Sequence, residues 1–67
     1  MIVVNGEARE LEAGETIADL LGRMDLDPAR RGVAVAVNGE VVPRAGWHER
    51  ILDEGARVEV LVAMQGG

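Results

Sequence analysis

Two copies of the tetrapeptide Val-Asn-Gly-Glu, at residues 4–7 and 37–40, limit the folds open to this chain more than any other feature of its sequence. Asn-Gly is the favoured pair for a two-residue type I′ hairpin turn, because both central positions of that turn need a positive φ. A β-branched apolar run precedes each copy. We therefore predict two β-hairpins, and we attribute the repetition to turn chemistry rather than to a duplicated domain.

An amphipathic helix is predicted between the two hairpins. Its apolar side chains recur at i, i+3, i+4 and i+7 and therefore share one face: Ile17, Leu20, Leu21 and Met24. Thr16 is the expected N-cap, and Asp19 three residues later completes an acidic variant of the capping box. Asp27-Pro28 excludes further helix, because proline lacks an amide donor and restricts the residue before it.

The remaining strands are predicted at residues 33–37, 41–42 and 57–62, with the first hairpin pairing residues 2–4 with 7–11. One helix covers only one face of a five-stranded sheet, so the other face should meet water. This arrangement is an α+β fold of the β-grasp (ubiquitin-like) type with a mixed sheet. A chain of 67 residues holds one core. We expect one domain over residues 1–62 and a flexible C-terminal tail over residues 63–67.

Strand alternation and the helical stripe predict an aliphatic core. Its expected members are Ile2, Val4, Leu11, Ile17, Leu20, Leu21, Val33, Val35, Val37, Leu52, Val58, Val60 and Val62. Trp47, the one aromatic residue, should close this core beneath its loop. Arg44 is expected either to be solvated or to contact a partner, and His48 to be ordinary surface.

The composition excludes several classes of function. The absence of cysteine excludes disulfides, thiolate metal sites and a cysteine nucleophile, and with a single histidine we expect no bound metal. A formal charge of −5 disfavours nucleic acid and anionic membranes and favours a basic protein partner. The sequence has neither a signal-peptide pattern nor an apolar run of membrane-spanning length, so a soluble cytoplasmic protein is expected. The sequence contains no convincing pair of nucleophile and general base, so we do not expect this chain to be an enzyme.

The last five residues, Ala63-Met64-Gln65-Gly66-Gly67, are the remaining candidate for chemistry. Fully extended, five residues reach about 17 Å, which is far enough to enter the active site of a neighbouring protein. Two glycines suit a narrow channel because they carry no Cβ atom. The Gly67 carboxyl is ionised at neutral pH, so it needs activation, for example by adenylation, before it can accept sulfur.

The stretch from Ala36 to Arg44, Ala-Val-Asn-Gly-Glu-Val-Val-Pro-Arg, followed by Trp47 and by the Gly-Gly end, resembles the ThiS family of thiamin-pathway sulfur carriers. The resemblance covers the whole chain. It implies that a ThiF-type, E1-like adenylyltransferase uses ATP to adenylate Gly67, which becomes a thiocarboxylate and donates sulfur to a ThiG-type thiazole synthase. A cysteine desulfurase could supply the sulfur, and no cofactor would be bound to this chain.

By the same resemblance, Gly66 and Gln65 thread the partner's active site. Carriers for molybdopterin synthesis and tRNA thiolation share the fold and the tail, as do ubiquitin-like protein modifiers, and these remain alternatives.

Alternation along the strands also predicts a docking surface on the wet face of the sheet. Its apolar members point outward on strands that a β-grasp makes neighbours: Val3, Ala34, Ala36 and Leu61. An apolar patch beside an active tail suggests contact with a partner. We expect Arg57 and Glu59 to form the rim of this patch, and the activating enzyme to bind it.

Overall fold

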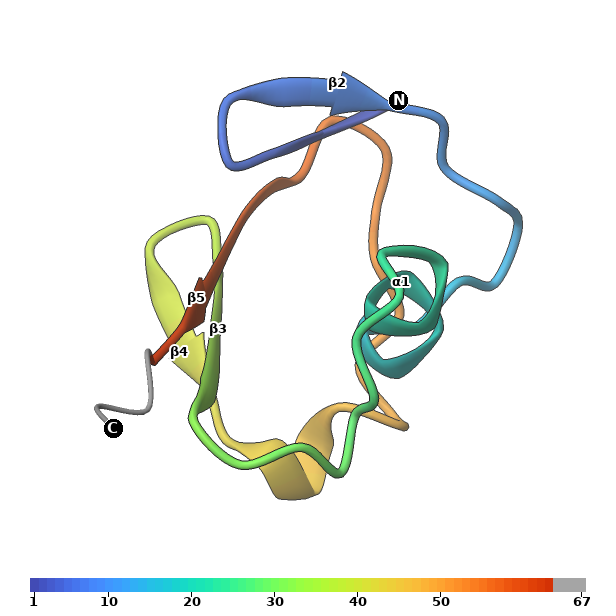
Figure 1. Ribbon diagram of the computed structural model, residues 1–67. Coiled ribbons are helices and arrows are strands. Elements are labelled where there is room, and N and C mark those ends of the chain that lie inside the picture. Colours follow the sequence, from blue (N-terminus) through green and yellow to red (C-terminus); the bar gives the residue numbers. More distant parts are fainter. Residues whose placement is uncertain (64–67) are drawn as a thin grey trace.

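The computed structural model describes residues 1–63, and these form a β-grasp fold (Figure 1). The elements in chain order are β1 (Ile2–Val4), β2 (Glu7–Arg9), α1 (Ile17–Arg23), β3 (Val33–Val37), β4 (Glu40–Val42), a 3₁₀ helix (Arg44–Gly46) and β5 (Arg57–Val62). The strand order is β2-β1-β5-β3-β4. β1 and β5 are parallel and the other neighbours antiparallel. The predicted mixed sheet with one helix on one face is confirmed.

Both predicted hairpin turns are present. Asn5 and Asn38 each have a φ of 50°, and the glycines that follow them have φ of 84° and 83°. These are the positive angles that a type I′ turn requires. The first hairpin is shorter than predicted, because Ile2 at the start of β1 already pairs with Arg9. Beyond Arg9 the second strand has almost no partner left, so β2 ends there instead of reaching Leu11.

The predicted capping box begins α1. The Asp19 backbone N–H donates to Thr16 Oγ1 over 3.1 Å, and the Thr16 N–H donates to Asp19 Oδ2 over 3.0 Å. The hydrogen bond from the Thr16 backbone N–H first, and then the Thr16 side chain, lower the pKa of the Asp19 carboxyl below its ordinary 3.8. The helix ends at Arg23, before the predicted stop at Asp27-Pro28, because Asp25 has a φ of 61° that no helix continues through.

The core lies between α1 and the inner face of the sheet, and eleven of the thirteen predicted members are buried. The prediction is wrong for Leu11, which is half-buried, and for Val62, which is 38% exposed. Val62 lies beyond the end of β1, so at this residue β5 has a neighbouring strand on one side only. The buried residues that the core list lacked are Ala18, Val42, Trp47 and Ala56.

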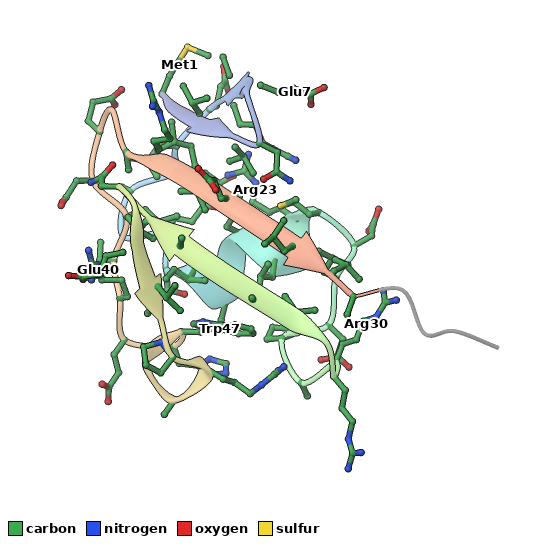
Figure 2. The ribbon with its side chains drawn as sticks, turned by 90° about the vertical axis from the view of Figure 1, so that its left-hand side faces the viewer. Met1, Glu7, Arg23, Arg30, Glu40 and Trp47 are labelled. Carbon is green, nitrogen blue, oxygen red and sulfur yellow. The ribbon has the colours of Figure 1, made fainter. Side chains whose placement is uncertain are left out.

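Trp47 closes the core as predicted: it is 2% exposed, and its Nε1–H donates to the Val42 carbonyl over 2.8 Å (Figure 2). Arg44 lies over it, with its guanidinium carbon 4.6 Å from the ring centroid. The same guanidinium donates to the carbonyls of Pro28 and Arg30. Arg44 is exposed, which fits the solvated environment expected for it, and it also ties the loop before β3 to the tryptophan.

A partly buried ion pair that the sequence did not suggest fixes the connection before α1. Glu15 is 3% exposed, and both of its carboxylate oxygens accept from Arg23 Nη1, over 2.7 and 2.8 Å. Arg23 Nη1 also donates to the Glu10 carbonyl, and the hydrogen bond with Glu15 raises the pKa of the guanidinium. The irregular segment before α1 is thereby held against the helix.

Candidate functional site

The sheet face that points away from α1, which we call the outer face, carries all six residues of the predicted docking surface. The residues of β1, β3 and β5 alternate between the core and this face, with the core-facing ones buried except Val62 at the end of β5. Across the strands Val3 lies opposite Arg57, Ala36 opposite Glu59, and Ala34 opposite Leu61. The structure therefore brings the six side chains together on one surface.

Arg57 and Glu59 do not form the rim that was expected. They lie on β5, which is the middle strand of the sheet, so they occupy the centre of the outer face. Val3 is on the β1 side of this charged centre, whereas Leu61, Ala34 and Ala36 lie on the β3 side or toward the end of β5. The surface therefore consists of a charged centre between apolar parts.

Val41 on β4 extends the apolar part and was missed from the sequence. It is 71% exposed and lies opposite Ala36, which in turn is two residues from Ala34 on the same strand. Together with Leu61, 66% exposed, these residues form a continuous apolar area over β3, β4 and the end of β5. Alternation along β4 could have predicted this position, because Val42 points inward and its neighbour Val41 must then point outward.

A shallow hollow of about 490 Å³ lies on the outer face beside the first hairpin turn. It is lined by Val3, Asn5, Gly6, Arg57, Glu59 and Leu61. Within residues 1–63 neither the Arg57 nor the Glu59 side chain belongs to an ion pair. Both charges are exposed and available to a partner with complementary groups.

The outer face continues into the C-terminal segment through the end of β5. Leu61 is two residues before Ala63, the last described residue. The tail prediction gave Ala63 no partner, but its N–H donates to the Gly32 carbonyl over 2.7 Å. The proposed sulfur site at Gly67 and the threading residues Gly66 and Gln65 lie outside the described residues, and their roles stay predictions.

Other kinds of site find little support in residues 1–63. No three histidine, aspartate or glutamate side chains in this range are grouped so that they could hold a metal ion. No helix in the same range is long and apolar enough to cross a membrane. His48 is exposed in its loop. The outer face and the chain end that follows it are therefore the candidate functional site.

Comparison with known proteins gives consistent results. The family model of the ThiS family matches residues 2–67. The sulfur carrier protein ThiS of Thermus thermophilus is 40% identical over 67 residues, covering 100% of both chains. The sulfur carrier protein ThiS of Escherichia coli K12 is 33% identical over 66 residues, covering 98% of this chain and 97% of the relative.

A thiazole synthase of Paramagnetospirillum magneticum is 35% identical over 66 residues, which cover 98% of this chain but 20% of that protein. Among solved structures, the crystal structure of the thiamine biosynthesis protein ThiS from Geobacter metallireducens has a TM-score of 0.76 and 31% identity, covering 98% of this chain and 97% of that one. A solution structure of a thiamine biosynthesis protein from the same organism also has a TM-score of 0.76. The chain belongs to the ThiS family.

Proposed function

We propose that this protein is a sulfur carrier of thiamin biosynthesis and that it carries its sulfur on the terminal carboxyl of Gly67. The observation that supports this most strongly is the family match, which runs from residue 2 to residue 67 and so includes the terminal Gly-Gly pair. Two full-length relatives bear the name sulfur carrier protein ThiS. The protein would then be a sulfur donor on which enzymes act, and not itself an enzyme.

The chemistry requires that the carboxylate be activated first. A carboxylate oxygen of Gly67 would attack the α-phosphorus of ATP, releasing pyrophosphate and leaving an acyl adenylate. Sulfide would then attack the acyl carbon and displace AMP, which gives the thiocarboxylate directly. Attack by a persulfide would instead give an acyl disulfide, and a second thiol would have to reduce its S–S bond to release the thiocarboxylate. This chain has no cysteine, so the sulfur nucleophile must come from outside it, as sulfide or as a persulfide on a cysteine desulfurase.

The partners we propose follow from these steps. An E1-like adenylyltransferase of the ThiF type would bind ATP and carry out the activation. A thiazole synthase of the ThiG type would receive the sulfur. In its favour, one fifth of the Paramagnetospirillum magneticum thiazole synthase resembles this whole chain, which suggests that carrier and synthase work side by side.

We further propose that the activating enzyme docks on the outer face. The apolar area around Leu61 would supply buried surface, and the central charges of Arg57 and Glu59 would set the orientation. The location favours this assignment, because Leu61 is six residues from Gly67 along the chain. An enzyme bound here could receive an extended C-terminus within about 20 Å of its docking contacts.

The test is the intact mass of the protein after incubation with the cognate ThiF-type enzyme, ATP and a sulfur source. We expect a gain equal to the replacement of one oxygen by one sulfur, and no gain without ATP or in a variant lacking Gly67. No gain with an enzyme shown to be active would refute the proposal. Isopeptide bonds to lysines of other proteins would indicate a modifier instead, and isopeptide bonds between copies of this chain are excluded because it has no lysine.

A further inference from the structure

Within residues 1–63 the backbone of β5 is hydrogen-bonded on its β1 side only as far as Val60. Asn5 N–H donates to the Val58 carbonyl over 2.9 Å, which is the last backbone hydrogen bond between the first hairpin and β5. At Val60 the side chain of Asn5 makes the hydrogen bonds that the backbone of a longer β1 would otherwise make. Its Oδ1 accepts from the Val60 N–H over 2.8 Å, and its Nδ2 donates to the Val60 carbonyl over 3.1 Å.

Val62 comes two residues later, so its N–H and C=O point to the same side of the strand as those of Val60. β1 has already turned away at Gly6, and no hydrogen bond from residues 1–63 reaches Val62 on this side. On its other side β5 is paired with β3, and Ala63 N–H donates to Gly32. Figure 2 shows the end of β5 running past the first hairpin toward the C-terminus.

We propose that an extended strand of the enzyme that processes Gly67 adds to β5 at Val62 and pairs with this open N–H and C=O. This inference rests on the proposed function. An unpaired strand edge is a template for another strand, and main-chain hydrogen bonds then supply affinity without regard to the side chain. Pairing at Val62 fixes the direction in which the following residues leave the domain.

The surroundings of Val62 fit a strand from a partner. The hollow on the outer face beside this edge is lined by the apolar side chains of Val3 and Leu61 and by the charged ones of Arg57 and Glu59, so a side chain of the added strand finds both kinds of contact there. A second copy of this chain fits poorly. The open edge offers a single described residue, since the Asn5 side chain occupies Val60, and two copies with a formal charge of −5 each repel one another.

The first experiment compares Val62→Pro with Val62→Ala as substrates of the ThiF-type enzyme, measured as ATP-dependent pyrophosphate release. Both substitutions remove the valine side chain, but only proline removes the N–H. Proline is tolerated at unpaired strand edges, so the melting temperatures of the two variants should be similar. We expect kcat/KM to be lower by about tenfold or more for Val62→Pro, in line with the loss of one interfacial hydrogen bond that leaves its acceptor unsatisfied.

The second experiment needs no variant and follows amide hydrogen exchange in the natural sequence by NMR. In the free protein the Val62 amide should exchange quickly and the Val60 amide slowly, and addition of the enzyme should protect Val62. Equal activation of the two variants, or no protection of Val62 by the enzyme, would overturn the inference. Protection that rises with the concentration of the protein alone would indicate a second copy and would overturn it as well.

The two experiments also separate this inference from the proposed function. If the natural protein is not activated, the proposed function fails, but protection of Val62 by the enzyme still decides whether a strand is added. If the natural protein and both variants are activated equally well, the sulfur-carrier function stands and strand addition is excluded.

Discussion

Asn5 provides a quantitative test of how the sheet holds its middle strand. Its side chain makes two hydrogen bonds to the backbone of Val60, over 2.8 and 3.1 Å, while its own backbone has a φ of 50°. Asn5→Gly removes both bonds and keeps the positive φ accessible. At about 1 kcal/mol for each bond, the free energy of unfolding should fall by about 2 kcal/mol.

Asn38 is the matched control, because it has the same φ of 50° in the equivalent turn. Its side chain accepts one hydrogen bond, from the Arg57 N–H over 2.9 Å. Asn38→Gly should therefore cost about 1 kcal/mol. Asn5→Ala loses the two bonds and also forces a residue with a Cβ atom into the left-handed region, which adds about 1–2 kcal/mol, so its total cost should be about 3–4 kcal/mol.

The assay is urea denaturation followed by fluorescence of Trp47, the only aromatic residue, which is buried in the folded state. The slope m should be the same for all variants, so that shifts in the midpoint report stability alone. Equal costs for Asn5→Gly and Asn38→Gly would show that the two bonds to Val60 contribute no more than the single bond to Arg57, and would refute the expected difference. Equal costs for Asn5→Ala and Asn5→Gly would refute the contribution of the backbone angle.

Two further predictions concern the outer face and the start of the helix. Leu61→Asp should weaken binding to the activating enzyme by about tenfold or more, because it places an unpaired charge in the apolar area, and should leave the circular dichroism spectrum unchanged. Ile51→Asp, at an exposed aliphatic residue outside that area, is the control, and equally tight binding of both variants would contradict the docking proposal. The lowered pKa of Asp19 means that its carboxylate stabilises the fold above its ordinary pKa of 3.8, and that this contribution is lost as the pH falls through the lowered value. The melting temperature of Asp19→Asn should therefore lie below that of the natural protein at neutral pH and approach it in acid, and a gap that does not change with pH would count against this account.

Most of the fold could be predicted because its signals are local. An Asn-Gly pair needs only its own backbone angles, and the stripe of Ile17, Leu20 and Leu21 needs only the helical period. Five strands with one helix then leave few arrangements that bury both apolar faces. The capping box at Thr16 was predictable for the same reason, since all its atoms lie within four consecutive residues.

The errors arose where the outcome depends on strand order or on distant side chains. Arg57 and Glu59 were placed at a rim because alternation gives the face of a residue but not the position of its strand in the sheet. Val62 was expected in the core for a similar reason, since the end of β1 decides its exposure. The hydrogen bonds of Arg44 were not predictable, because their acceptor carbonyls are 14 and 16 residues away in the sequence and no periodic pattern indicates such a contact.

The place of β5 in the sheet has a consequence for the synthesis of this protein. Of the five strands that the structure describes, β5 is the last in the sequence, and it alone pairs with both β1 and β3. While the chain is being made, the two hairpins therefore have no strand between them with which both could pair. The five-stranded sheet forms only after residues 57–62 have left the ribosome. A chain broken off before this point exposes unpaired strand edges and should be readily degraded, so a folded molecule is one whose synthesis has passed β5.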